Sequence, residues 1–368
     1  MPPRRPPASY RVTLDRGRPC PSPPAEIEGI AYREATPDGP STLAPARCLQ
    51  GFRESYVEHL AGTEVHGTVA RVRGWPEITE PLLRERQGMS NQEFFEFLAG
   101  LLDAIGTREL EDEHYERAIG YPWGRRPGSC LVSDEGVEDL CDVDAGRRKE
   151  LVGEYLEGSD DRIPLLAYGA NASPERLALK LAHLPDGHRE ALILAGDLQG
   201  FDVGAAAQPP LFSSMPATLI PSPGAAVRVA VLFLTPIQFT ALWWTEVSYK
   251  LGALTGITLT TDVAEDPIER VIVFISRFGA FCVDGAPVAM AAITGRNRSS
   301  MALTQTEILE AAARMSIGEG STARDLIKAS FENPAAFMAE RFATFQAASV
   351  AFESEHWAEM PVTGDGSG

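Results

Sequence analysis

Two short stretches of the sequence contain residue types that could carry out chemistry. In the first, 165–177 (LLAYGANASPERL), a buried strand is predicted to run through a glycine turn directly into a helix. Pro174 suits the first helical position, where its missing N–H costs nothing. Gly169 lets a ligand approach the backbone, and the free N–H groups of a helix start favour an anion. The pattern therefore predicts a small-anion site, but a plain strand-turn-helix connection capped by Asn171 or Ser173 has the same pattern.

The second stretch is 242–246 (LWWTE), with Tyr249 three residues beyond its glutamate. A carboxylate beside Trp243 and Trp244 is predicted to be partly desolvated. Desolvation raises the pKa of a carboxyl group toward the range that suits proton transfer. Glu246 is therefore a candidate general acid/base. The alternative is an exposed glutamate at a helix end whose tryptophans pack in the core.

Composition limits the partners of this chain of 368 residues. Its formal net charge is −18, so it repels phosphate backbones and anionic lipids, and neither nucleic acid nor a membrane surface is an expected partner. The longest apolar run, 229–244, is interrupted and falls short of the ~20 residues of a membrane helix. No signal-peptide pattern is present, and we expect a cytoplasmic protein.

The sequence predicts neither a metal nor a cofactor. The five cysteines are scattered without a paired spacing, and no phosphate-binding glycine motif occurs. His183, Asp186 and His188 could be imagined as metal ligands, but a solvated loop is the expected reading. Arg296 and Arg298 could reach a substrate carboxylate, although surface arginines are the default expectation.

Four regions are predicted along the chain. Residues 1–46 are a Pro/Arg-rich disordered tail, 47–160 are mainly helical, 161–300 form an α+β core, and 301–360 form C-terminal helices. Capping boxes are expected at Ser90/Glu93, Thr235/Gln238 and Thr304/Glu307, and a two-residue hairpin at Asp284-Gly285. Helices are expected at 109–117, 147–156 and 174–184, and strands at 165–168, 217–220, 227–234, 256–260 and 270–276.

Together, the two stretches resemble the gamma-glutamylcyclotransferase-like family over residues 164–260. The resemblance lies in Tyr168-Gly169-Ala170-Asn171 before a helix, the segments 217–221 and 229–234, the Thr-Pro-x-x-Phe at 235–239, and a glutamate before a tyrosine. It implies a mixed β-barrel/sheet with flanking helical extensions. It also implies that the loop 168–171 holds the amino-acid end of a substrate, with Tyr249 nearby, and that Glu246 is the general acid/base.

The sequence departs from the family pattern in two places. Alanine stands at 170, where the family usually has serine, and Trp243-Trp244-Thr245 replaces the usual residues before the glutamate. The expected reaction needs no cofactor: the α-amine of a small γ-glutamyl amide attacks its own γ-carbonyl and releases 5-oxoproline and an amine. The alternatives are a hydrolytic amidase and a non-catalytic binding or scaffolding protein with the same fold. The helical extensions leave open a homo-oligomer or a macromolecular substrate.

Overall fold

The computed structural model describes residues 86–105, 107, 109–156, 162–210, 214–264 and 266–360, all of which belong to one unit of the chain. The predicted disordered tail 1–46, the first part of the predicted helical region and the residues after 360 lie outside the described residues.

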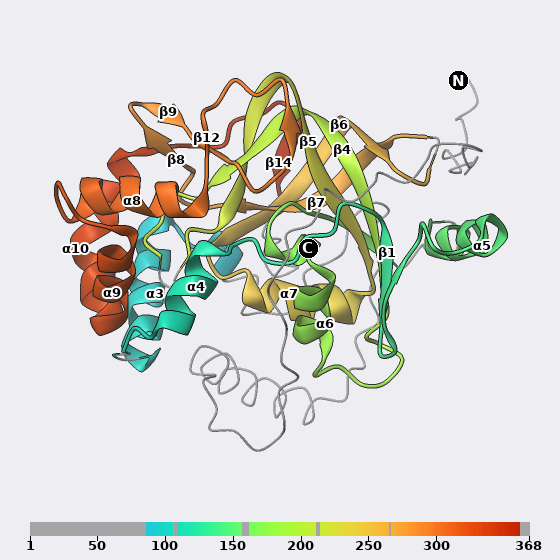
Figure 1. Ribbon diagram of the computed structural model, residues 1–368, viewed down its shortest axis with the longest axis horizontal. Helices are drawn as coiled ribbons and strands as arrows, with labels where there is room; N and C mark the ends of the chain where they lie inside the picture. The colour runs from blue at the N-terminus through green and yellow to red at the C-terminus, as the bar shows by residue number, and fades with distance from the viewer. Residues whose placement is uncertain are drawn as a thin grey trace, which may run out of the picture. The chain divides into compact units, whose positions relative to one another are not determined.

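Five strands close into a small barrel (Figure 1). They are β3 (Ile163–Ala167), β4 (Ala191–Ala205), β5 (Ala217–Leu234), β6 (Tyr249–Thr261) and β7 (Ile268–Ser276). Each strand pairs with two others, in the cyclic order β3–β5–β4–β6–β7. The pair β3–β7 is parallel and the other four are antiparallel. This barrel and the helices around it confirm the predicted α+β class.

The strand β5 shows why these residues form a barrel. Val227, Val229 and Val231 alternate with residues of the opposite face, and all three pack in the main hydrophobic core. The intervening Ala230 and Leu232 are also buried. Both faces of the strand are therefore covered, which explains a nearly continuous apolar run without helical periodicity.

The predicted strands differ from the observed ones in two places. The segments 217–220 and 227–234 were expected as two strands, but they belong to the single strand β5; the β4–β5 register shifts opposite Gln199 and Phe201, where the segment around Pro221 is accommodated. The long strand β4 was not predicted. Glycine is uncommon inside strands, yet a Cβ at Gly196 would lie 2.6 Å from the carbonyl oxygen of Thr260. The close approach of β6 therefore requires glycine.

The remaining elements surround the barrel. The helical segments are α3 (Asn91–Ile105), α4 (Asp112–Ile119), α5 (Ala145–Leu156), η1 (Ala170–Ala172), α6 (Pro174–Leu181), α7 (Pro236–Thr245), α8 (Gln305–Ser316), α9 (Ala323–Glu332) and α10 (Pro334–Ala347). The other strands are β1 (Cys130–Ser133), β2 (Gly136–Asp139), β8 (Ala280–Val283), β9 (Ala286–Pro287), β10 (Ala289–Met290), β11 (Gly295–Arg296), β12 (Ala302–Leu303), β13 (Ser349–Val350) and β14 (Trp357–Glu359). In Figure 1, α6 and α7 lie together below the barrel, and α3, α4 and α8–α10 gather at one side.

Several predicted local signals are confirmed. The capping boxes Ser90/Glu93 and Thr304/Glu307 have both of their hydrogen bonds, and in Thr235/Gln238 the Thr235 N–H donates to Gln238 Oε1 at 2.8 Å. The Asp284-Gly285 turn joins β8 to β9 with positive φ at both residues. The helix expected at 174–184 ends at Leu181. The hairpin β1–β2, which extends the sheet through β4, was not predicted within the mainly helical region.

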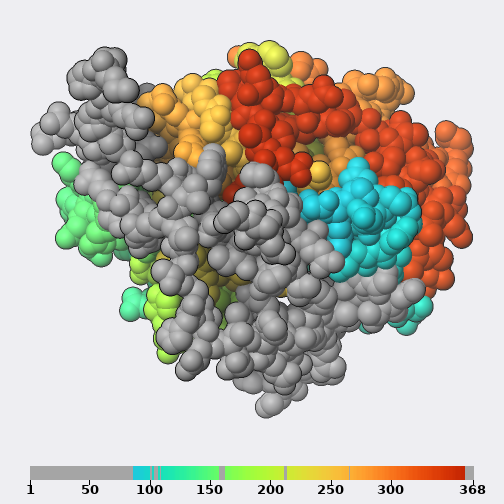
Figure 2. Space-filling view, turned by 180° about the vertical axis from the view of Figure 1, so that it is seen from behind, coloured from blue at the N-terminus to red at the C-terminus, as the bar shows by residue number. Residues whose placement is uncertain are grey.

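Residues 86–89 anchor α3 to the barrel. The buried guanidinium of Arg277 donates hydrogen bonds to the carbonyls of Arg86, Gln87 and Met89. The Gln87 side chain pairs with both backbone polar groups of Leu251 in β6, at 2.9 and 3.0 Å. Figure 2 shows α3 (cyan) lying against the C-terminal part of the chain (red), as its contact with α10 requires. None of the helices among the described residues is long and apolar enough to cross a membrane.

Candidate active site

Two elements that are distant in sequence bring the predicted residues together. The strand β3 ends at Ala167, and the chain then forms the loop 168–171 and the short η1. Helix α7 ends at Thr245, and the N–H of the C-cap residue Glu246 donates to the Trp243 carbonyl at 3.1 Å. At its other end, α7 is fixed by Gln238, which bonds Thr235 in the capping box and the Glu190 carbonyl at 2.7 Å. Because α6 and α7 pack together, the end of α7 faces the loop.

Asn171, Lys180 and Glu246 form a cluster of hydrogen bonds, here called the acid–amide cluster. The Glu246 Oε1 atom accepts from Asn171 Nδ2 at 3.0 Å and from Lys180 Nζ at 2.9 Å. Lys180 Nζ also donates to Asn171 Oδ1 at 2.6 Å. The Glu246 side chain is 14% exposed and that of Lys180 is 23% exposed. The structure therefore joins two predicted residues, Asn171 and Glu246, through a third that the sequence analysis did not select.

The pKa of Glu246 contradicts the expectation from its tryptophan neighbours. Burial raises this pKa, but the ammonium of Lys180 and the hydrogen bonds from Lys180, Asn171 and Thr245 outweigh burial, so the pKa lies below its ordinary value. The expected upward shift is therefore wrong. Trp243 packs instead against aromatic rings of the core, with its ring centroid 5.8 Å from that of Phe239.

The hydroxyl groups of the two predicted substrate-binding tyrosines donate hydrogen bonds to backbone carbonyls of the protein itself. Tyr168 is buried and donates to the carbonyl of Phe274. Tyr249 donates to the carbonyl of Ala217 at 2.6 Å. Burial, reinforced by the negative charge of Glu246, raises the pKa of both phenols well above the ordinary value. Both tyrosines are therefore neutral groups at physiological pH.

A third tyrosine, Tyr121, lies directly against the loop. Its hydroxyl accepts a hydrogen bond from the N–H group of Ala217 at 2.9 Å. A Cβ at Gly169 would lie 2.5 Å from this hydroxyl, so the contact requires glycine at 169. Burial is the main cause that raises the pKa of Tyr121 to about 12, and the charge of Glu246 adds to it. Since the oxygen acts as the acceptor in this bond, its own proton remains a hydrogen-bond donor.

The loop itself uses several of the N–H groups that were expected to bind an anion. The N–H groups of Ala172 and Ser173 donate to the carbonyls of Gly169 and Ala170. Ser173, rather than Asn171, is the N-cap of α6 and accepts from the Arg176 N–H at 3.4 Å. The expected small-anion site is therefore partly filled by the protein's own groups.

The other candidates have structural partners. Asp186 pairs with Arg189 at 3.0 Å. Arg296 pairs with Asp197 at 2.9 Å, and Arg298 lies 3.2 Å from the buried Asp202. Within the described ranges, no group of three or more His, Cys, Asp or Glu side chains could hold a metal ion.

Lys180 and Tyr121 are the site residues that sequence reasoning missed. Lys180 had a signal: Leu177 and Leu181 are buried on the same face of α6, so a lysine between them points inward at a position typical of apolar residues. Tyr121 had none, because its contact with Gly169 joins residues from different regions of the chain.

Comparison with protein-family models and with curated proteins finds no match to this chain. The assignment of the site therefore depends on the residues and geometry described above.

Proposed function

We propose that this protein is a cofactor-independent, gamma-glutamylcyclotransferase-like enzyme that cyclises or cleaves a small γ-glutamyl-type amide, with Glu246 as general acid/base. The observation that supports it best is the hydrogen bond between Asn171 of the loop and the Glu246 carboxylate, which lie 75 residues apart in sequence. The two short motifs of the resemblance thus meet at one place.

The state of the carboxylate suits a general base. Its lowered pKa keeps Glu246 ionised at neutral pH. The three hydrogen bonds from Asn171, Lys180 and Thr245 all go to Oε1. Oε2 receives none from the part of the chain that the structure describes, and it is the atom that would accept the proton.

The proposed reaction is balanced without a cofactor. Glu246 Oε2 takes a proton from the α-ammonium of the substrate, and the freed nitrogen attacks the γ-carbonyl carbon to form the new ring C–N bond. Tyr121, whose proton remains a donor, lies beside the loop and would stabilise the developing oxyanion. The original amide C–N bond then breaks, and Glu246 returns the proton to the leaving nitrogen. The ring nitrogen gives up its second proton to the released amine, which leaves as an ammonium ion. The products are 5-oxoproline and an amine.

A second candidate is a non-catalytic binding protein that uses the same residues. The ion pair between Lys180 and Glu246 favours it, because an ammonium already occupies the carboxylate. The absence of a hydroxyl at Ala170 points the same way.

The test is turnover of γ-glutamyl amines and γ-glutamyl dipeptides by the purified full chain, with 5-oxoproline and free amine followed by mass spectrometry. Glu246→Gln keeps the shape of the side chain and removes its basicity, so turnover should fall by at least about 10²-fold. Glu332→Gln, an exposed carboxylate of α9, is the matched control and should leave turnover unchanged.

The products separate the alternatives. Formation of 5-oxoproline that depends on Glu246 supports cyclisation, whereas glutamate would indicate the hydrolytic amidase. Binding of a γ-glutamyl compound without turnover would support the non-catalytic candidate. Equal turnover by the wild type and Glu246→Gln would rule out the proposed role of this residue.

A further inference from the structure

The acid–amide cluster joins three groups that can react with one another. Lys180 provides an amine, Asn171 provides an amide carbonyl carbon, and Glu246 provides a carboxylate. An amine that attacks an amide carbon expels the amide nitrogen, and a nearby carboxylate can carry the protons. All three groups belong to the protein itself, so this reaction needs no substrate.

The contacts place the attacking and the leaving nitrogen on the same oxygen atom. Glu246 Oε1 lies 2.9 Å from Lys180 Nζ, the attacking nitrogen, and 3.0 Å from Asn171 Nδ2, the leaving nitrogen. Lys180 Nζ also lies 2.6 Å from Asn171 Oδ1, which is bonded to the carbon that the amine must attack. One carboxylate oxygen can therefore take a proton from the first nitrogen and give it to the second.

The surrounding elements keep the three groups together. Asn171 lies in η1, Lys180 lies near the end of α6, and Glu246 is the C-cap of α7, which packs against α6. The meeting of amine and amide is therefore intramolecular, which removes much of the entropic cost of a reaction between separate molecules. The amine must approach the face of the amide, so Asn171 has to rotate about its Cβ–Cγ bond. Torsions of this kind are soft.

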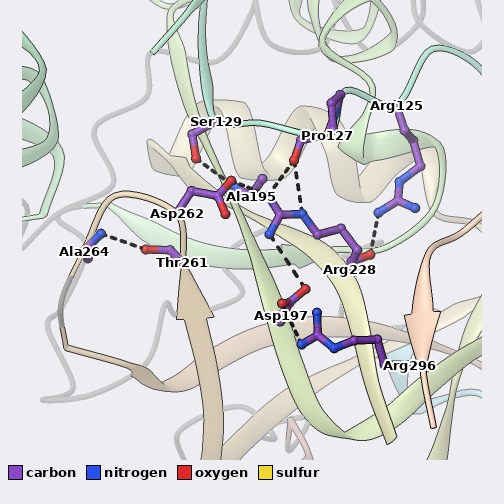
Figure 3. A network of polar contacts seen from close by, with 10 residues as sticks. All are labelled: Arg125, Pro127, Ser129, Ala195, Asp197, Arg228, Thr261, Asp262, Ala264 and Arg296. Atoms are coloured by element: carbon purple, nitrogen blue, oxygen red, sulfur yellow. Dashed lines mark hydrogen bonds and ion pairs between the residues drawn. The ribbon is translucent and has the colours of Figure 1, made fainter. Parts of the chain in front are cut away.

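The charged network around Arg228 contains arginines where the acid–amide cluster contains a lysine (Figure 3). Arg228 pairs with Asp262 and lies 3.7 Å from Asp197, which also pairs with Arg296. A guanidinium stays protonated in proteins, so it cannot serve as a nucleophile. The network in Figure 3 therefore has a structural role, whereas the acid–amide cluster contains the groups of a reaction.

A second set of lysine, carboxylate and amide shows which contacts matter. Lys250 and Gln87 both bind Glu359, but Lys250 donates to Oε2 at 2.9 Å and Gln87 donates to Oε1 at 3.2 Å. The carbonyl oxygen of the Gln87 side chain accepts from the Leu251 N–H at 2.9 Å. The two nitrogens thus contact different oxygens of the carboxylate, and this set is an internal control.

We propose that the folded protein slowly forms an amide bond between Lys180 Nζ and Asn171 Cγ, with Glu246 as the proton carrier. The reaction is slow because the ammonium of the ion pair must first give up a proton. The inference does not depend on turnover of a substrate, since the internal pair uses Glu246 Oε1 and the proposed function uses Oε2.

The reaction is balanced with groups of the chain alone. Glu246 takes a proton from the Lys180 ammonium, and the freed amine attacks Asn171 Cγ to form the new C–N bond. Glu246 passes this proton to Nδ2, the original C–N bond breaks, and ammonia leaves. The new amide nitrogen gives up its second proton to the ammonia, which departs as an ammonium ion. The products are a lysine–asparagine cross-link and an unchanged glutamate.

Mass spectrometry of the purified full chain tests the cross-link. Incubation of the folded protein at neutral pH for several days should produce a species that is lighter by one ammonia. Trypsin should then release residues 163–176 joined to 177–189, because a linked Lys180 is no longer cleaved. Wild-type protein that keeps its full mass and releases 177–180 as a free peptide would overturn the inference.

Variants test the role of each group. Glu246→Gln keeps the amine and the amide but removes the base, so the rate of linkage should fall by at least about 10²-fold. Lys180→Arg and Asn171→Ala each lack a reacting group and should not form the link. Glu359→Gln is the same substitution in the control set and should leave the rate unchanged. Equal rates in the wild type and Glu246→Gln would overturn the role of the carboxylate.

A different loss of ammonia must be separated from the cross-link. The backbone nitrogen that follows an asparagine can attack its side chain and release ammonia, and that reaction requires neither Lys180 nor the fold. A mass loss that persists in Lys180→Arg or in urea-unfolded wild type would therefore overturn the inference. If a variant fails to fold, the tryptic peptides of the wild type still decide the question. Neither result bears on turnover of γ-glutamyl compounds, which is measured separately.

Discussion

At the scale of single residues, Lys180 sets the charge state of the candidate base. Burial is the largest influence on the pKa of Glu246 and acts upward, and the nearby ammonium reverses it. A base must be deprotonated to act, so this ion pair extends activity to lower pH. The Asn171 hydrogen bond contributes in the same direction.

Replacing Lys180 by Met should therefore move the acid limb of the kcat/KM–pH profile to higher pH. Without the ammonium, burial dominates, the pKa of Glu246 rises, and the carboxylate is protonated over more of the acid range. The free energy of unfolding at pH 7 should fall by about 1–3 kcal/mol, because a buried carboxylate loses a partner. Stopped assays across pH and urea unfolding measure both.

Lys180→Arg is the control, since it keeps the positive charge and should largely restore both quantities. The unfolding measurement does not depend on turnover. The lowered pKa stabilises the folded protein above the ordinary pKa of a glutamate, and this contribution is lost as the pH falls through the folded-state pKa. A Lys180→Met profile and stability like those of the wild type would contradict the role assigned to the ion pair.

The contact of Asn171 with Glu246 shows how much of the candidate site could be predicted from the sequence. Both residues were predicted, but only the resemblance linked them, because no periodicity relates residues on separate elements. Lys180 could have been selected from the sequence, because it lies on the apolar face of its helix. Tyr121 could not, since its role comes from one segment packing along another.

At the scale of elements, Arg277 anchors the first described segment to the barrel. Its buried guanidinium binds three carbonyls at 86–89 and lies 4.6 Å from the Phe94 ring of α3. Arg86, held in this way, donates to the Trp243 carbonyl at 2.6 Å, at the end of α7 that leads to Glu246.

Arg277→Met should loosen α3 and the end of α7. Hydrogen exchange at 91–105 and 243–246 should become faster, and the free energy of unfolding should fall by about 1.5–3 kcal/mol, because carbonyls bonded to a charged donor lose it. Arg296→Met is the contrast: its exposed pair with Asp197 should contribute less than about 1 kcal/mol. Equal effects of the two substitutions would argue against the anchor.

Strand prediction succeeded where β-branched residues dominate and failed where geometry demanded glycine. The strands near 227–234 and 270–276 are runs of Val and Ile and were predicted. In β4, Gly196 and Gly204 reduced the apparent strand propensity, yet a Cβ at either would lie 2.6 Å from a carbonyl oxygen. Such a close approach depends on which segments meet β4 in the fold, and local sequence does not encode it.

At the scale of the whole molecule, the net charge of −18 is a source of self-repulsion. Salt screens repulsion among exposed charges, so raising NaCl from 20 mM to about 0.5 M at pH 7.5 should increase the Tm by about 2 °C or more. Differential scanning fluorimetry measures this shift.

The same titration near the pI of about 4.8 is the control, because the net charge there is close to zero and the increase should vanish. A Tm that falls with salt at pH 7.5 would mean that screened ion pairs, such as the Arg228–Asp262 pair, outweigh the repulsion.

The ion pair between Lys180 and Glu246 has a consequence for recognition. A substrate ammonium that reaches the Oε2 atom of Glu246 meets a carboxylate whose other oxygen is already held by Lys180. One negative charge then lies between two ammonium groups, and the repulsion between them weakens this part of the affinity. Free primary amines would compete for Oε2, and the protein's own lysine already takes up part of the charge on which its ligand depends.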